Sequence, residues 1–71
     1  MTIGNRIKML REERGISQYE LATMIGYSSR SSINKIELNQ RGVPIEKLNS
    51  LAEALGTTPN TLLGWKEDDE Q

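Results

Sequence analysis

The sequence predicts a small all-α domain built from five short helices. Apolar residues recur at helical spacing in successive segments, and no segment alternates apolar and polar residues as a half-buried strand would. A glycine or a helix-capping residue stands at most boundaries between these segments. A chain of 71 residues has room for one such domain with a thin core.

The first helix is predicted from Ile3, Ile7 and Leu10, whose i, i+4, i+7 spacing places them on one stripe. It should run from about residue 2 to residue 14. Gly15 should then end it in a left-handed cap.

The second helix opens with the string "SQYE", in which Ser17 and Glu20 have the spacing of a capping box. Gly26 should end this helix after about two turns. The third helix begins within "YSSRSSINKIE", where either Ser28 or Ser29 can cap it.

The third helix should have one buried face and one polar face. Its inward residues are Ile33, Ile36 and Glu37. The opposite residues are three and four positions apart, so they should form one patch. This patch consists of Arg30, Ser31, Asn34 and Lys35.

Residues 38–44, "LNQRGVP", show little periodicity and are predicted to be a loop. The fourth helix, which ends at Gly56, should bury Leu48, Leu51, Ala52 and Leu55. Thr58 and Pro59 suit the start of a fifth helix. We expect Trp65 to be a hydrophobic plug for that helix, or alternatively a dimer contact. Residues 66–71 are acidic and are expected to be a disordered tail or the start of a linker.

The composition excludes several classes of function. The chain has no histidine and no cysteine, so it has no histidine general base and no zinc site that uses these ligands. We therefore expect no enzyme activity, catalytic residue, cofactor, metal or small-molecule substrate. No apolar run approaches a membrane span and no leader is evident, so a cytoplasmic protein without membrane contacts is expected.

Charge is distributed unevenly along the chain, although the formal net charge is only −1. Residues 1–47 carry eight Lys and Arg and five Glu, a balance of +3. Residues 48–71 carry one Lys and five acids, a balance of −4. This asymmetry is compatible with nucleic-acid binding by the first part, and equally with a solvated surface and a soluble tail.

Two short helices joined by a tight glycine-containing turn, with a polar outward face on the second, describe a helix-turn-helix. In such motifs the second helix enters the major groove of DNA. The strings "RGISQYELA", "INKIE" and "LAEALGTTPNTLLGW" resemble the Cro/CI (XRE-type) repressors of phages and bacteria, and the resemblance covers residues 3–65. One departure is the spacing from Gly26 to Ile33, which is seven residues where family members commonly have six.

The resemblance implies a lambda-repressor-like domain over residues 1–65 that binds double-stranded DNA sequence-specifically as a transcriptional repressor. A recognition helix of about residues 29–38 would lie in the major groove. The residues implied to contact bases are Arg30, Ser31, Asn34 and Lys35. Arg and Lys suit the acceptors of guanine, Asn suits adenine, and Ser can serve either base. A solvated helix face is the competing interpretation.

Other residues are implied to contact the DNA backbone: Gln18, Ser29, Ser32, Asn39, Gln40 and Arg41. For the serines, helix capping is an alternative role, and for the loop residues turn formation is the alternative. The resemblance also implies a partly buried ion pair between Arg11 and Glu37. Tyr19 and Tyr27 could both lie along the DNA backbone, and Tyr27 could instead cover the edge of the core.

The expected partner is a two-fold DNA operator bound by a homodimer, because one recognition helix reads only a few base pairs. Dimer contacts would come from the last helix of a complete Cro-like protein, or from a C-terminal domain absent from this chain. The rival hypothesis is a helical protein-interaction module, such as an antitoxin or a regulator-binding domain. DNA binding should weaken steeply with salt, whereas an apolar protein interface should not.

Overall fold

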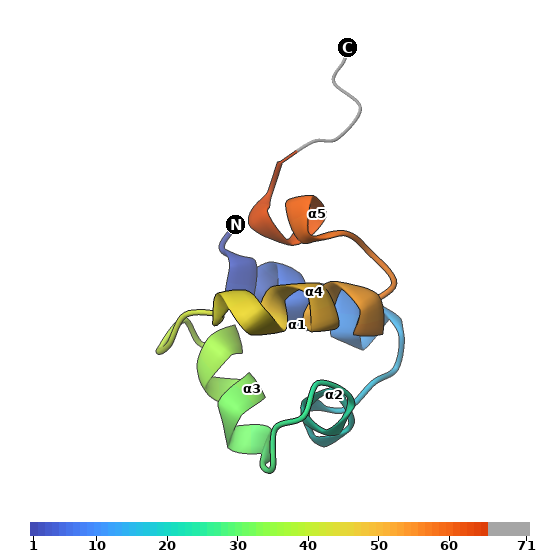
Figure 1. Cartoon of the computed structure of the whole chain (residues 1–71), viewed down its shortest axis with the longest axis vertical. Coiled ribbons are helices and arrows are strands. Elements are labelled where there is room, and N and C mark those ends of the chain that lie inside the picture. The colour runs from blue at the N-terminus through green and yellow to red at the C-terminus, as the bar shows by residue number, and fades with distance from the viewer. Residues whose placement is uncertain (66–71) are drawn as a thin grey trace.

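The computed structural model describes residues 1–65, and within that range it contains five α-helices and no strand. In chain order the helices are α1 (Ile3–Glu13), α2 (Gln18–Met24), α3 (Arg30–Glu37), α4 (Ile45–Ala54) and α5 (Pro59–Leu63). Figure 1 shows α2 and α3 at one end of the molecule and α5 at the other, with α1 and α4 between them. The predicted all-α fold is confirmed. The predicted tail, residues 66–71, lies outside the described range.

Four of the five described helices begin at a residue whose side chain caps them, and α4, which follows Pro44, has no such cap. In the capping box of α2, Glu20 N–H donates to Ser17 Oγ at 3.0 Å, and Ser17 N–H donates to Glu20 Oε1 at 2.8 Å. Ser29, rather than Ser28, caps α3, because its Oγ accepts from Ser31 N–H at 3.0 Å. Each such cap typically stabilises a helix by about 1 kcal/mol.

Each of the five helices within residues 1–65 ends at a residue in the left-handed conformation. The N–H groups of that residue and of the next one bond back to carbonyls in the last turn. Four of these left-handed residues are Gly15, Gly26, Gly56 and Gly64, but α3 ends at Asn39 with φ 61°. These short helices are held by packing, and none described here has the length and apolar character to cross a membrane.

The core lies between all five helices. Its seven largest fully buried side chains are Ile7, Leu21, Ile33, Ile36, Leu51, Leu55 and Leu62. Burying a side chain of this size stabilises the fold by roughly 1.5–3 kcal/mol relative to exposing it. Because α3 contributes two of the seven, one face of α3 is anchored and its other face is left free.

Gly4 allows α1 to pass close to the end of α3. A Cβ atom at this position would collide with the backbone carbonyl of Ile36 and would lie 2.7 Å from Asn39 Oδ1. Any larger residue would therefore push the C-terminal end of α3 away from α1. The absence of a side chain at position 4 thus helps to set where α3 sits.

The prediction that Trp65 plugs the last helix is wrong, because its side chain is 65% exposed. Leu62, which is fully buried, fills the core position of α5 instead. Gly64 then turns the chain in a left-handed conformation, φ 87°, and directs Trp65 away from the core. Arg6 closes this end of the domain by donating from Nη1 to the carbonyl of Leu62 at 3.2 Å.

Candidate nucleic-acid interface

The turn between α2 and α3 holds the two helices against each other. Gly26 is left-handed, with φ 88°, and Tyr27 N–H donates back to the carbonyl of Ala22 at 2.9 Å. Ser29 is extended and starts α3 at the next residue. The turn therefore accommodates the longer spacing between Gly26 and Ile33 before α3 begins.

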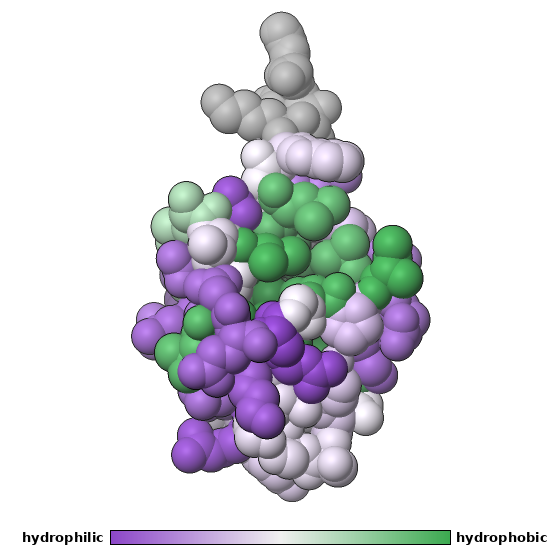
Figure 2. Space-filling model, turned by 90° about the vertical axis from the view of Figure 1, so that its left-hand side faces the viewer, coloured by the Kyte–Doolittle hydropathy of each residue, from purple (hydrophilic) through white to green (hydrophobic). Residues whose placement is uncertain are grey.

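The outward face of α3 carries the four residues predicted to contact bases. Arg30, Ser31 and Lys35 are exposed, and Asn34 is half-buried. Figure 2 shows the side of the molecule on which α3 and the following loop lie. Its lower half, at the level of α2 and α3, is covered mostly by hydrophilic and weakly polar residues. The structure thus brings the predicted base-contacting residues together on one accessible polar surface.

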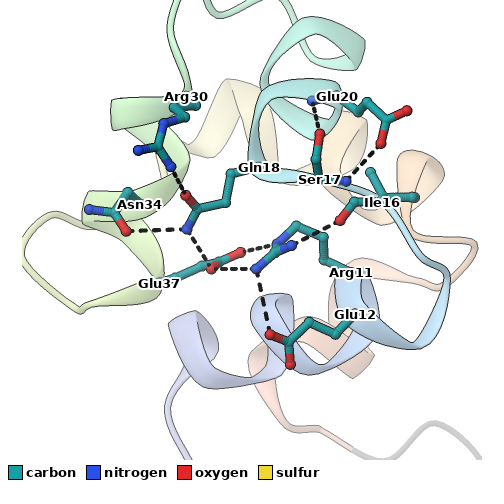
Figure 3. Close-up of polar contacts among 9 residues, drawn as sticks. All are labelled: Arg11, Glu12, Ile16, Ser17, Gln18, Glu20, Arg30, Asn34 and Glu37. Carbon is teal, nitrogen blue, oxygen red and sulfur yellow. Dashed lines mark hydrogen bonds and ion pairs between the residues drawn. The ribbon is translucent and has the colours of Figure 1, made fainter.

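Gln18, the first residue of α2, joins that surface to the interior (Figure 3). Its Nε2 donates to Asn34 Oδ1 at 3.2 Å and to Glu37 Oε1 at 3.0 Å. Its Oε1 accepts from Arg30 Nη1 at 3.1 Å. Both amide hydrogens are used within the protein, so a phosphate contact through this side-chain amide would require one of these bonds to break. That predicted contact stays a prediction.

The ion pair implied between Arg11 and Glu37 is present. Arg11 Nε donates to Glu37 Oε2 at 2.7 Å and Nη2 donates to Oε1 at 3.1 Å. The third nitrogen, Nη1, donates to the carbonyl of Ile16 at 2.9 Å. The Glu37 side chain is only 2% exposed and that of Arg11 is 12% exposed. Pairing through two hydrogen bonds compensates the loss of hydration of the Glu37 carboxylate, which is almost completely removed from water.

The hydrogen bond with Glu37 raises the pKa of the Arg11 guanidinium above its ordinary value. Burial opposes this increase, and the negative charges of Glu37 and Glu12 add to it. A basic group whose pKa is higher in the folded protein stabilises the fold at every pH below its ordinary pKa. That stabilisation is lost as the pH rises through the higher, folded-state pKa. For arginine both values lie far above neutrality, so Arg11 stays cationic across the physiological range.

Sequence reasoning missed the polar chain that runs from Arg11 through Glu37 and Gln18 to Arg30. The signal that could have found it is the spacing of Arg30, Asn34 and Glu37, which is i, i+4, i+7 on α3. These positions form one polar stripe, and in the structure the stripe faces Gln18 on α2. A polar stripe beside a buried face indicates contacts with a neighbouring helix as well as with solvent.

The predicted backbone-contacting residues fall into two groups. Ser29 is the N-cap of α3 and Ser32 is half-buried in its first turn. Asn39, Gln40 and Arg41 are all exposed in the loop after α3. Their backbone shapes that loop, since Gln40 N–H donates to the carbonyl of Lys35 at 2.8 Å. Their proposed contacts with DNA remain predictions.

Lys47 was not singled out from the sequence, although it borders the same turn. Its Nζ donates to the carbonyl of Ile25, at the end of α2, at 2.8 Å. It also lies over the ring of Tyr27, 5.1 Å from the centroid. Position 47 is 22 residues from Ile25, so no local pattern indicated this contact. Within the described range no group of three acidic side chains could hold a metal ion.

A tight turn between α2 and α3 and a free polar face on α3 define a helix-turn-helix domain. The model of the helix-turn-helix family HTH_3 matches residues 7–62, so the chain belongs to this family. The resemblance inferred from the sequence is therefore confirmed.

Two curated relatives are phage or bacterial regulators. The chain is 36% identical over 64 residues to the immunity repressor protein of Bacillus phage phi105, a match that covers 90% of this chain and 44% of the relative. It is 38% identical over 69 residues to the HTH-type transcriptional regulator SinR of Bacillus licheniformis, covering 96% of this chain and 61% of the relative. The chain thus spans about half the length of the curated relatives it matches.

Among solved structures, the fold is similar to that of the P22 c2 repressor protein in complex with a synthetic operator. The TM-score is 0.86 with 30% sequence identity, and the match covers 93% of this chain and 98% of that chain. The similarity therefore extends over both helices of the turn and over the helices that support them.

Proposed function

We propose that this chain is a sequence-specific double-stranded DNA-binding domain of a transcriptional repressor. The observation that carries the proposal is the division of α3 into two faces. Ile33 and Ile36 are fixed in the core, while Lys35 is exposed on the far side of the helix and Arg30 is exposed at the edge beside Gln18. A helix anchored in this way can enter a major groove without losing core contacts. The solved complex of the similar P22 c2 repressor with an operator supports this function.

Within this proposal, the side chains on α3 read base edges and the surrounding residues bind phosphates. The proposed base contacts are Arg30, Ser31, Asn34 and Lys35. The proposed backbone contacts are Gln18, Ser29, Ser32, Asn39, Gln40 and Arg41. Phosphate contacts supply much of the affinity, and base contacts supply the preference for one sequence.

We further propose that two copies bind a two-fold operator whose half-sites lie about one helical turn, roughly 34 Å, apart. The dimer contacts would lie in the last helix of this chain or in a further C-terminal domain. The greater length of the curated relatives supports the second arrangement.

The alternative function is a protein-interaction module, and exposed apolar side chains favour it. Ile45 is 85% exposed and Trp65 is 65% exposed. Neither belongs to α3, so these exposed apolar side chains and the polar face of α3 can be tested separately.

The test is selection of bound duplexes from a random pool, followed by affinity measurements at 50 and 200 mM salt. The proposal predicts an enriched motif and an affinity that falls steeply with salt. Lys35→Ala should weaken binding, whereas Lys8→Ala, which removes an exposed lysine from α1, should change it much less. No enrichment, or equal effects of the two lysine changes, would contradict the proposal and favour the protein-interaction module.

A further inference from the structure

Tyr27 occupies the junction between the end of α2, the loop after α3, and α4. Its backbone is held by the hydrogen bond to Ala22 that ends α2. Its ring is half-buried and packs against the hydrophobic core. With both backbone and ring held, the side chain provides a fixed aromatic face.

Two cations from later parts of the chain lie over this ring. Lys47 Nζ, from α4, is 5.1 Å from the ring centroid, and Arg41 Cζ, from the loop after α3, is 5.6 Å from it. Both distances are within the roughly 6 Å over which an aromatic face attracts a cation. The ring of Tyr27 is therefore in contact with two positive charges from separate segments of the chain.

The two cations differ in what remains free for a ligand. Lys47 is committed to the carbonyl of Ile25, at the end of α2 where a positive charge is favoured. Arg41 is exposed and, within residues 1–65, makes no ion pair and no hydrogen bond through its side chain. Its guanidinium donors are therefore available, while the ring restricts a side chain that otherwise has many rotamers.

We propose that Tyr27 is a positioning residue for DNA binding, whose ring holds Arg41 ready to bind a backbone phosphate. The proposal rests on the proposed function and adds a residue that itself touches no DNA. It requires the aromatic face but not the phenol group, because the Tyr27 hydroxyl oxygen is buried and has no hydrogen-bond partner within the described chain. Ordering a side chain before binding lowers the entropy lost on binding.

The experiment is a double-mutant cycle measured as the Kd for a selected duplex. Tyr27→Leu keeps an apolar side chain but removes the aromatic face, and it should weaken binding about 2- to 5-fold on all sequences alike. In an Arg41→Ala background the same change should have no further effect. Tyr27→Phe is the matched control and should bind like the unchanged chain.

A second measurement does not depend on DNA. In the free protein, the side-chain protons of Arg41 should show a ring-current shift in the NMR spectrum. The shift should persist in Tyr27→Phe and vanish in Tyr27→Leu. Thermal melts of all variants would establish that each is folded.

Three outcomes would overturn the positioning role. The first is that Tyr27→Leu changes the Kd by the same factor whether or not Arg41 is present. The second is that Tyr27→Leu leaves the Kd unchanged, and the third is that Arg41 shows no ring-current shift in the unchanged protein. If the unchanged chain binds no duplex while the shift is present, the proposed function itself fails. That result is distinguishable because the contact between ring and guanidinium would still be observed.

Discussion

The guanidinium of Arg11 and the carboxylate of Glu37 meet in two hydrogen bonds of 2.7 and 3.1 Å, although 26 positions separate them in the chain. This pair joins α1 to α3. The same carboxylate accepts a hydrogen bond from Gln18 at the start of α2. One buried acidic group therefore helps to fix the position of the proposed recognition helix relative to two other helices.

Replacing Glu37 with alanine should lower the free energy of unfolding by about 3–5 kcal/mol. The change leaves the Arg11 cation largely buried without its carboxylate and removes an acceptor from Gln18. Urea or thermal unfolding would measure the loss, and Glu53→Ala, at an exposed position on α4, is the matched control. A melt that Glu37→Ala leaves unchanged would show that the pair contributes no net stability.

Arg30→Ala should reduce the affinity for the selected operator by roughly 1–3 kcal/mol and relax the preference at one base position. The guanidinium can donate two hydrogen bonds to the acceptors of guanine, which alanine cannot replace. Comparing binding across single-base variants of the operator would measure both effects. A loss of equal size on every variant would mean that Arg30 contacts the backbone instead.

The substitution Gln18→Ala distinguishes between two possible roles of Gln18, which are to contact a DNA phosphate and to orient the side chains of α3. The structure commits the Gln18 amide to Arg30, Asn34 and Glu37. Losing these bonds should broaden the base preference at positions read by Arg30 and Asn34, because both side chains gain rotational freedom. Selection with the variant would reveal this change. An unaltered motif bound more weakly, with a shallower salt dependence, would instead support a phosphate contact.

Asn39 can be tested with two substitutions that both remove its side chain. Asn39→Ala should lower the free energy of unfolding by about 1 kcal/mol, because alanine tolerates the left-handed conformation poorly. Asn39→Gly should not lower it, because glycine adopts that conformation freely. Thermal melts check the stability of both. If the side chain binds phosphate, the two variants should lose DNA affinity equally, whereas glycine should bind normally if only the turn matters.

Features governed by neighbouring residues were predictable from the sequence. The capping box of Ser17 and Glu20, the left-handed Gly15 and the end of the second helix at Gly26 were predicted correctly, because each involves residues within a few positions of one another. The buried faces of the helices followed from apolar spacing in the same way. The resemblance, rather than any local pattern, supplied the pair of Arg11 and Glu37.

Contacts between distant segments were not predictable in this way. Gln18 is 12 positions from Arg30 and 19 from Glu37. The polar stripe on α3 indicates contacts with a neighbouring helix, but the local sequence does not specify which residue makes them. The expectation for Trp65 was based on the high average burial of large aromatic side chains, whereas here the buried residue of α5 is Leu62 and Trp65 is 65% exposed. Whether a core position is still vacant depends on how all five helices pack.

Under the proposed function, the hydrogen bond that links Gln18 to Arg30 also limits how readily this domain can evolve a new operator preference. A replacement at position 30 that cannot donate leaves the Gln18 Oε1 without its partner, so a change of base contact also disturbs a supporting residue. Lys35 is exposed and takes no part in this chain of contacts within residues 1–65. Divergence between relatives that recognise different operators should therefore begin more easily at position 35 than at position 30.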